Sequence, residues 1–160
     1  MPFVYEKTDH PRWKYRTTQS YQHTYAVVNQ QHLGSAPPST TPKYECKRET
    51  CVLQESYAWN GSNVVADTED SQRASAVHDA MCQAMDEDIY QGSWKNWQRA
   101  AAEYRVMCIT DGLKRVKSDG KRWVRIRAGW VRSRAWTRYN GILIGGGHKV
   151  KWRKWAKKFG

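Results

Sequence analysis

The sequence predicts an α+β fold in which a small N-terminal antiparallel sheet precedes a three-helix body and a basic amphipathic C-terminal tail. Short β-prone runs separated by turn residues fill the chain up to residue 60, whereas apolar residues recur at helical spacing from residue 70 onward. Glycines cluster between residues 141 and 147, and the last residues are rich in lysine and tryptophan. A chain of 160 residues is long enough for one domain with its own core.

The composition divides the chain into three parts. We expect an N-terminal arm and linker over residues 1–43, because the run from Gly34 to Pro42 has the composition of a loop. A single α+β domain is expected over residues 44–140. A glycine hinge and a basic, tryptophan-rich tail are expected over residues 141–160.

The strands and helices follow from local patterns. A β-prone run covers Tyr21 to Val28, short strands are expected over 44–46 and 50–53, and residues 57–59 would extend the same small sheet. Capping residues and apolar spacing predict three helices: from Asp70 or Ser71 to about Met85, from Ser93 to Asp111-Gly112, and from about Gly120 to Tyr139.

Charge is concentrated in the C-terminal third. The chain has 27 Lys and Arg against 15 Asp and Glu, a net charge of +12, and residues 113–160 hold 16 basic residues and one acid, hence +15. Nine Trp and nine Tyr accompany this charge, and such amphipathic aromatics suit surfaces that remain partly wet. Basic residues on one side of the third helix could bind phosphate or a partner, or could form a solvated face: Arg127, Arg134 and Arg138.

Residues 148–159 are expected to form a short amphipathic helix or strand. Trp152, Trp155 and Phe159 share one helical face, which Lys151 and Lys154 flank. Three exposed aromatic side chains would be an unusual free surface. We therefore expect the tail to dock on the body of the protein, a neighbouring subunit, nucleic acid or a membrane surface.

Two classes of segment are not found in the sequence. No apolar run approaches the roughly 18–20 residues of a membrane-spanning helix, and Met1 to Phe3 does not open a signal peptide. The four cysteines contain no C-x-x-C pair and match no zinc spacing, so we expect reduced thiols.

The most informative stretch joins an aromatic-glycine loop to a helix that carries adjacent histidine and aspartate. The loop reads Y-A-W-N-G-S at 57–62, V-H-D-A follows at 77–80, and R-A-A-A-E and C-I-T-D-G follow at 99–103 and 108–112. This order resembles a bacteriophage and prophage family, domain-of-unknown-function family 1353 and its relatives. The resemblance implies a virion or a host-cytoplasmic location and other phage proteins as partners.

A more distant resemblance is to phospholipase A2. It implies that Asp79 binds Ca²⁺ with backbone carbonyls near Asn60 and Gly61, that His78 is the general base, and that Glu103 orients it. A hard cation prefers oxygen ligands, and an imidazole suits proton abstraction near neutral pH. Asn60 stands where the phage family usually has Asp, which removes a charge from the loop. The same residues also fit a structural role, with His78 in the core.

These observations lead to three functional hypotheses. The first is a virion or tail-associated structural or accessory component, with a vestigial or active His-Asp metal site. The second is a calcium-dependent, phospholipase-like hydrolase that acts on a host membrane. The third is a nucleic-acid-binding phage protein.

Overall fold

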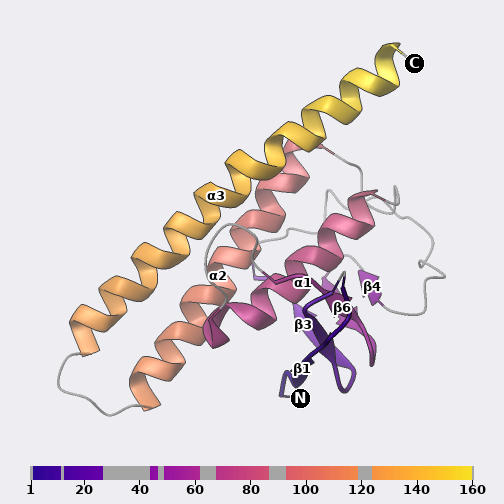
Figure 1. Cartoon of the computed structure of the whole chain (residues 1–160). Helices are drawn as coiled ribbons and strands as arrows, with labels where there is room; N and C mark the ends of the chain where they lie inside the picture. The colour runs from indigo at the N-terminus through magenta and orange to yellow at the C-terminus, as the bar shows by residue number, and fades with distance from the viewer. Residues whose placement is uncertain are drawn as a thin grey trace.

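The computed structural model describes residues 2–11, 13–26, 44–46, 49–61, 68–86, 93–118 and 124–159, the last of these with side chains over 126–144. Within these residues six short strands precede three helices, which confirms the α+β class with an N-terminal sheet region (Figure 1). The strands are β1 (Tyr5–Lys7), β2 (Tyr15–Thr17), β3 (Tyr21–Thr24), β4 (Tyr44–Cys46), β5 (Thr50–Leu53) and β6 (Ala58–Trp59). The helices are α1 (Glu69–Asp86), α2 (Trp94–Ser118) and α3 (Val124–Phe159).

The strands form two antiparallel sheets, where the sequence predicted one. The orders are β1-β2-β6 and β3-β5-β4, so β6 does not extend the β4-β5 pair. The chain turns between β5 and β6 at Ser56, which has a positive φ of 65°. The amide of Ser56 then donates to the carbonyl of Thr17, and Tyr15 pairs with Trp59 in the ladder. This turn transfers the chain from one sheet to the other.

Residues from both sides of the expected boundary at 43 pair within the same sheets. β1 and β2 pair with each other and β2 with β6, while β3 pairs with β5 along its full length. The described residues up to Ala26 are therefore integral to the domain and do not form a separate arm. The expected linker over 34–42 lies outside the described residues.

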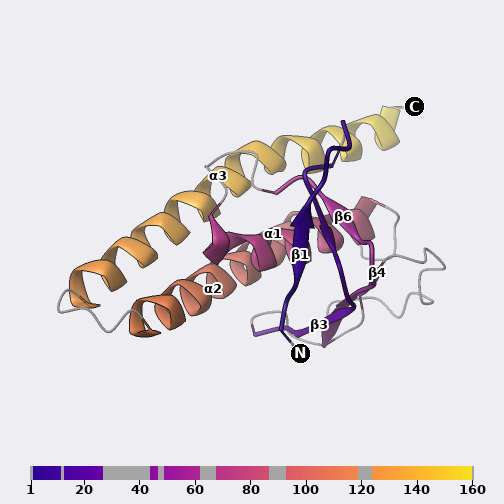
Figure 2. The ribbon, with the colours of Figure 1, turned by 60° about the horizontal axis from the view of Figure 1, so that its bottom comes forward.

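The helices form layers beside the sheets (Figures 1 and 2). α1 contacts strands of both sheets, α2 packs on α1, and α3 packs on α2. The core lies between the sheets and α1, where Trp59 is fully buried and its indole Nε1 donates to Ser75 Oγ at 3.0 Å. Small buried residues on α1, such as Ala76 and Ala80, leave room in the core for large aromatic side chains such as Trp59.

The helix starts show which capping residues the chain uses. Thr68 caps α1: its carbonyl accepts from the amide of Ser71 at 2.8 Å, and its own amide donates to Ser71 Oγ at 3.2 Å. The predicted cap at Asp70 or Ser71 was thus two or three residues late. Ser93 caps α2 as predicted, because its Oγ accepts from the amide of Asn96 at 3.1 Å.

Two predicted helix ends are wrong. α2 continues through Asp111-Gly112 to Ser118, and α3 continues through residues 141–147 to Phe159, so the backbone has no break at the expected hinge. Glycine lowers helix propensity by about 1 kcal/mol relative to alanine but permits helical geometry. With 36 residues, α3 is about 54 Å long at 1.5 Å per residue.

Gly112 is required for the close packing of α2 on α3. A Cβ at this position would lie 2.6 Å from Cγ1 of Val131 and 3.3 Å from Oδ2 of Asp70. The side chain of Val131 is itself buried, so it has little room to move. The glycine that the sequence suggested as a helix stop is therefore a contact between helices.

We expect Gly112→Ala to lower the free energy of unfolding by about 1–2 kcal/mol, because overpacking exceeds the gain in helix propensity. Gly129→Ala is the matched control. A Cβ there has nothing within 4 Å, so the same substitution is expected to raise the free energy of unfolding by about 0.5–1 kcal/mol. Urea denaturation of both variants measures the difference; equal shifts would contradict the packing described here.

None of the described helices combines the length and the apolar character needed to cross a membrane. The cysteines at 46, 51, 82 and 108 are all free.

Candidate functional site

The predicted base, His78, is a buried ring between α1 and α2. It packs edge-on against Trp97 and Tyr104, with ring centroids 5.6 and 5.7 Å away. Its polar neighbours lie on α1: Nε2 is 3.6 Å from Sγ of Cys82, and Nδ1 is 3.6 Å from Oδ1 of Asp79. Helical spacing places Cys82 one turn after His78, so this cluster is local to one helix.

The electrostatics of this cluster favour a charged imidazole. Burial lowers the pKa of His78, but Cys82 and Asp79 raise it by more, to about 10. Burial also raises the pKa of the Cys82 thiol, although the charge of His78 lowers it. A histidine that already carries the proton cannot remove one from water.

The pKa shift of His78 predicts a pH dependence of stability. The folded-state pKa of His78 lies above the ordinary 6.5, so the protonated imidazole stabilises the folded state. This contribution to the free energy of unfolding is complete below pH 6.5 and is lost as the pH rises towards about 10. The raised pKa of Cys82 acts in the same direction above its ordinary 9.0. We expect the free energy of unfolding to fall steadily across this range. NMR of the imidazole measures the titration directly, and a midpoint at or below 6.5 would contradict the assignment.

Glu103 is fully buried, but its main contacts are with the N-terminal strands. Its Oε1 lies 2.7 Å from Nε2 of His23, a residue of β3, and both carboxylate oxygens accept from the amide of Ala26, at 2.9 and 3.1 Å. The sequence predicted that Glu103 would orient His78. The structure instead gives this carboxylate the role of fixing the end of β3 to α2.

Only the first part of the loop before α1 lies within the described residues. Burial raises the pKa of the Tyr57 hydroxyl there, and the charge of Asp79 raises it further. Gly61 is buried with a φ of 73°, and Asn60 is half-buried. Among the described residues, however, no group of three or more His, Cys, Asp and Glu side chains is placed to hold a metal ion. A calcium site at Asp79, Asn60 and Gly61 stays a prediction.

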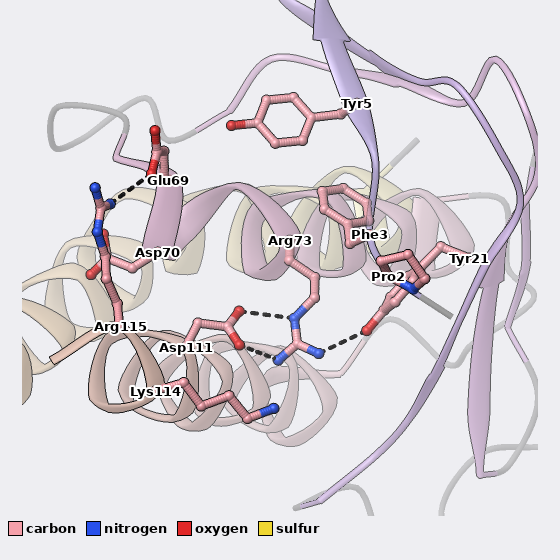
Figure 3. A pocket seen from close by; sticks show the side chains of 10 residues that line it. All are labelled: Pro2, Phe3, Tyr5, Tyr21, Glu69, Asp70, Arg73, Asp111, Lys114 and Arg115. Atoms are coloured by element: carbon pink, nitrogen blue, oxygen red, sulfur yellow. Dashed lines mark hydrogen bonds and ion pairs between the residues drawn. The ribbon is translucent and has the colours of Figure 1, made fainter. Parts of the chain in front are cut away.

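A cleft of about 540 Å³ opens where β1, α1 and α2 meet (Figure 3). Arg73 lies at its base and donates to both carboxylate oxygens of Asp111, at 2.8 and 2.7 Å, and to the hydroxyl of Tyr21 at 2.8 Å. Phe3 and Tyr5 form the opposite wall. The bidentate pair links α1 to α2 and to β3, so its geometry is that of a structural clamp.

The sequence did not single out Arg73 or Asp111. Both lie within the stretch that resembles the phage family, Arg73 shortly before V-H-D-A and Asp111 within C-I-T-D-G. Nothing in this stretch indicates that the two side chains, 38 residues apart, form a pair. The other two carboxylates of the cleft are also paired, Glu69 with Arg115 and Asp70 with Arg134. All three cleft carboxylates, including that of Asp111, are therefore engaged in ion pairs.

Two of the arginines predicted to bind a partner or phosphate are used inside the protein. Arg138 is buried, and its Nη2 donates to Oγ1 of Thr68 at 2.7 Å. Nη2 of Arg134 lies 2.8 Å from Oδ2 of the buried Asp70. The prediction is therefore wrong for Arg138, whose guanidinium cannot reach an external phosphate. Arg138 lies three residues after the buried Ala135 and seven after the buried Val131, so helical spacing places it near the core-facing side of α3.

Arg127 is exposed, and it flanks a surface of α3 with large apolar side chains. The exposed fractions are 58% for Ile126, 67% for Trp130, 57% for Trp136 and 72% for Ile144. We call this surface the outer face of α3. In Figure 1 α3 is the outermost helix, separated from the sheets by α1 and α2. The tail side chains Lys151, Trp152, Lys154, Trp155 and Phe159 lie outside the described residues.

No family model matches the chain, and no curated protein or solved structure does so either. The resemblance of about residues 55–136 to a phage family remains a prediction.

Proposed function

We propose that the protein is a binding component of a larger assembly, of the virion or tail type that the resemblance of about residues 55–136 implies, and that it docks through the outer face of α3. The single observation that carries this proposal is the line of large exposed apolar groups on one helix. Ile126, Trp130 and Ile144 lie on a helix whose opposite side is already packed on α2. Ile126 and Trp130 lie one turn apart and Ile144 lies at the far end of the same face, and exposed apolar side chains of this size favour an interaction site.

The energetics of docking are adequate. Burying one large aromatic or aliphatic side chain contributes roughly 1.5–3 kcal/mol. Three or four such side chains exceed the lower estimates of about 4 kcal/mol for the entropy lost on association. Tryptophan is also among the residues most enriched at the energetic centres of interfaces.

A catalytic function has less support. The imidazole of His78 is buried and favours the protonated form, and the carboxylate of Glu103 is bonded to His23 and the Ala26 amide. Activity would require His78 to release its proton to solvent from a position that Trp97 and Tyr104 cover. The cluster is better explained as a packed junction of α1 and α2.

Incorporation into purified particles tests the proposal. We expect the double variant Trp130→Ser/Trp136→Ser to fold normally and to incorporate at least about tenfold less, because its exposed indoles contribute to docking and not to the core. Trp94→Ser is the matched control, since Trp94 is also exposed, at 38%, but lies at the start of α2. Quantitative mass spectrometry of the particles measures both. Wild-type levels of the double variant would refute the proposal.

Nucleic acid binding is a second candidate. The observation that favours it is the exposure of Arg127 and Arg132 beside Trp130 and Trp136, since cations and indoles together bind phosphates and stacked bases. Binding of a fluorescent oligonucleotide should then weaken steeply between about 0.05 and 0.2 M salt. Affinity that is unchanged over this range would exclude this candidate.

A further inference from the structure

The outer face of α3 has the residue spacing of a helix–helix seam. Its positions recur at alternating steps of four and three residues, which is the repeat that keeps one side of a helix facing a partner helix. The exposed positions are Ile126, Trp130, Ser133, Thr137 and Ile144, and the half-buried Asn140 completes the repeat. Apolar side chains lie at both ends of this seam, and small polar ones lie between them.

A hollow of about 500 Å³ lies along this seam. Ile126, Gly129, Trp130 and Ser133 line one part of it, and these positions are i, i+3, i+4 and i+7. Four residues in this relation form the hole that accepts one side chain of a facing helix. The hollow continues over Arg134 and Thr137, which form the next hole along the helix together with Trp130 and Ser133.

Gly129 forms the floor of the first hole. A Cβ at this position would have nothing within 4 Å, so no contact inside the chain requires a glycine here. The residue lowers helix stability and yet lies in the middle of a long helix. Small residues allow close approach between helices, so an external helix gives this glycine a role.

Charge indicates the chemistry of the occupant. Arg127 and Arg132 are exposed along the seam, and residues 113–160 carry +15. A second copy of α3 would bring like charges together, whereas acidic flanks on a partner helix would complement them. The apolar floor of the hollow distinguishes this surface from a purely electrostatic one.

We propose that the outer face of α3 receives an amphipathic α-helix of a partner protein, with acidic flanks and with a large aliphatic side chain that enters the hole over Gly129. This inference rests on the proposed docking function and specifies its partner. The hole fixes the register of the complex, and the arginines fix which helices are accepted.

Binding of a designed helical peptide tests the partner chemistry. The peptide has about four heptads, with Leu at the contact positions and Glu on the flanks; a second peptide has Lys on the flanks. With the full-length protein at about 0.15 M salt, we expect the Glu peptide to bind at least about tenfold tighter, as measured by fluorescence anisotropy. Equal affinities for the two peptides would overturn the inference.

Filling the hole tests the geometry. Gly129→Leu should weaken binding of the Glu peptide by at least about tenfold, whereas Gly129→Ala should change it by at most about threefold. Circular dichroism checks that both variants fold, and the open space around Gly129 makes this the expected result. Unchanged binding by Gly129→Leu would overturn the proposed hole.

Two other occupants would also overturn the inference. A concentration-dependent dimer that Gly129→Leu abolishes would identify a second copy of the chain as the occupant. An oligonucleotide that displaces the Glu peptide and binds Gly129→Leu as tightly as wild type would identify nucleic acid. If Trp130→Ser/Trp136→Ser loses incorporation into particles while Gly129→Leu does not, the docking function stands and only the helical partner fails.

Discussion

Glu103→Ala is expected to lower the free energy of unfolding by about 3–5 kcal/mol, because it removes one member of a buried polar group and leaves the others without a partner. The carboxylate accepts from Nε2 of His23 and from the amide of Ala26, and it has no exposed surface. These bonds connect α2 to the end of β3, so their loss should loosen the N-terminal strands. Urea denaturation measures the change.

Glu103→Gln is the matched control for this prediction. Its amide oxygen can still accept from Ala26, and no cavity forms, so we expect a loss of only about 1–2 kcal/mol. Hydrogen exchange at residues 21–26 should increase in Glu103→Ala and much less in Glu103→Gln. If Glu103→Ala unfolds within about 1 kcal/mol of wild type, the buried connection does not contribute as described.

Asp70→Ala is expected to cost a similar amount, about 3–5 kcal/mol, because it removes a carboxylate next to two arginines of α3. Nη2 of Arg134 is 2.8 Å from Oδ2 of Asp70, and Nη1 of the buried Arg138 is 4.0 Å from the same atom. Alanine would leave a positive charge inside the protein with less compensation. The result would be a weaker attachment of α3 to the start of α1.

Glu69→Ala separates this effect from a general effect of charge at the start of α1. Glu69 is the neighbouring residue, but its pair with Arg115 is on the surface, with side chains 75% and 57% exposed. Surface pairs contribute little, so we expect a loss of at most about 0.5 kcal/mol. Thermal or urea denaturation of the two variants compares them, and equal losses would show that Asp70 acts only through the helix dipole.

Patterns that depend on neighbouring residues predicted much of the fold. Ser93 as the cap of α2 and the helical span from about 70 to 85 both follow from local sequence signals. The turn at Ser56 did not, because a positive φ in a non-glycine residue depends on bonds to the distant Thr17. The glycines were interpreted as breaks, although Gly112 instead allows contact with Val131.

The candidate site was only partly predictable for a similar reason. The sequence places His78 and Asp79 side by side, and in the structure Nδ1 of His78 lies 3.6 Å from Oδ1 of Asp79. The partner of Glu103, however, is His23, which is 80 residues earlier in the chain. Likewise, sequence position alone cannot show that Arg138 is buried against Thr68 while Arg127 faces outward. Such pairings depend on how the helices pack.

The distribution of arginines along α3 has a functional consequence. Arg134 and Arg138 stabilise the contact of α3 with α1, while Arg127 and Arg132 are exposed. The internal pairs hold the helix in one orientation, so the indole rings of Trp130 and Trp136 are presented outward on a rigid support. A docking surface that is preorganised in this way loses less entropy on binding.

Oxidative footprinting of tryptophan tests the docking claim most directly. Hydroxyl-radical oxidation of Trp130, Trp136 and Trp94 is measured by mass spectrometry in the isolated protein and in the purified assembly. Trp130 and Trp136 are 67% and 57% exposed in the isolated chain, so both should react readily there and be protected in the assembly, while Trp94 serves as the reference on α2. Equal oxidation of Trp130 and Trp136 in the two states would contradict docking through the outer face of α3.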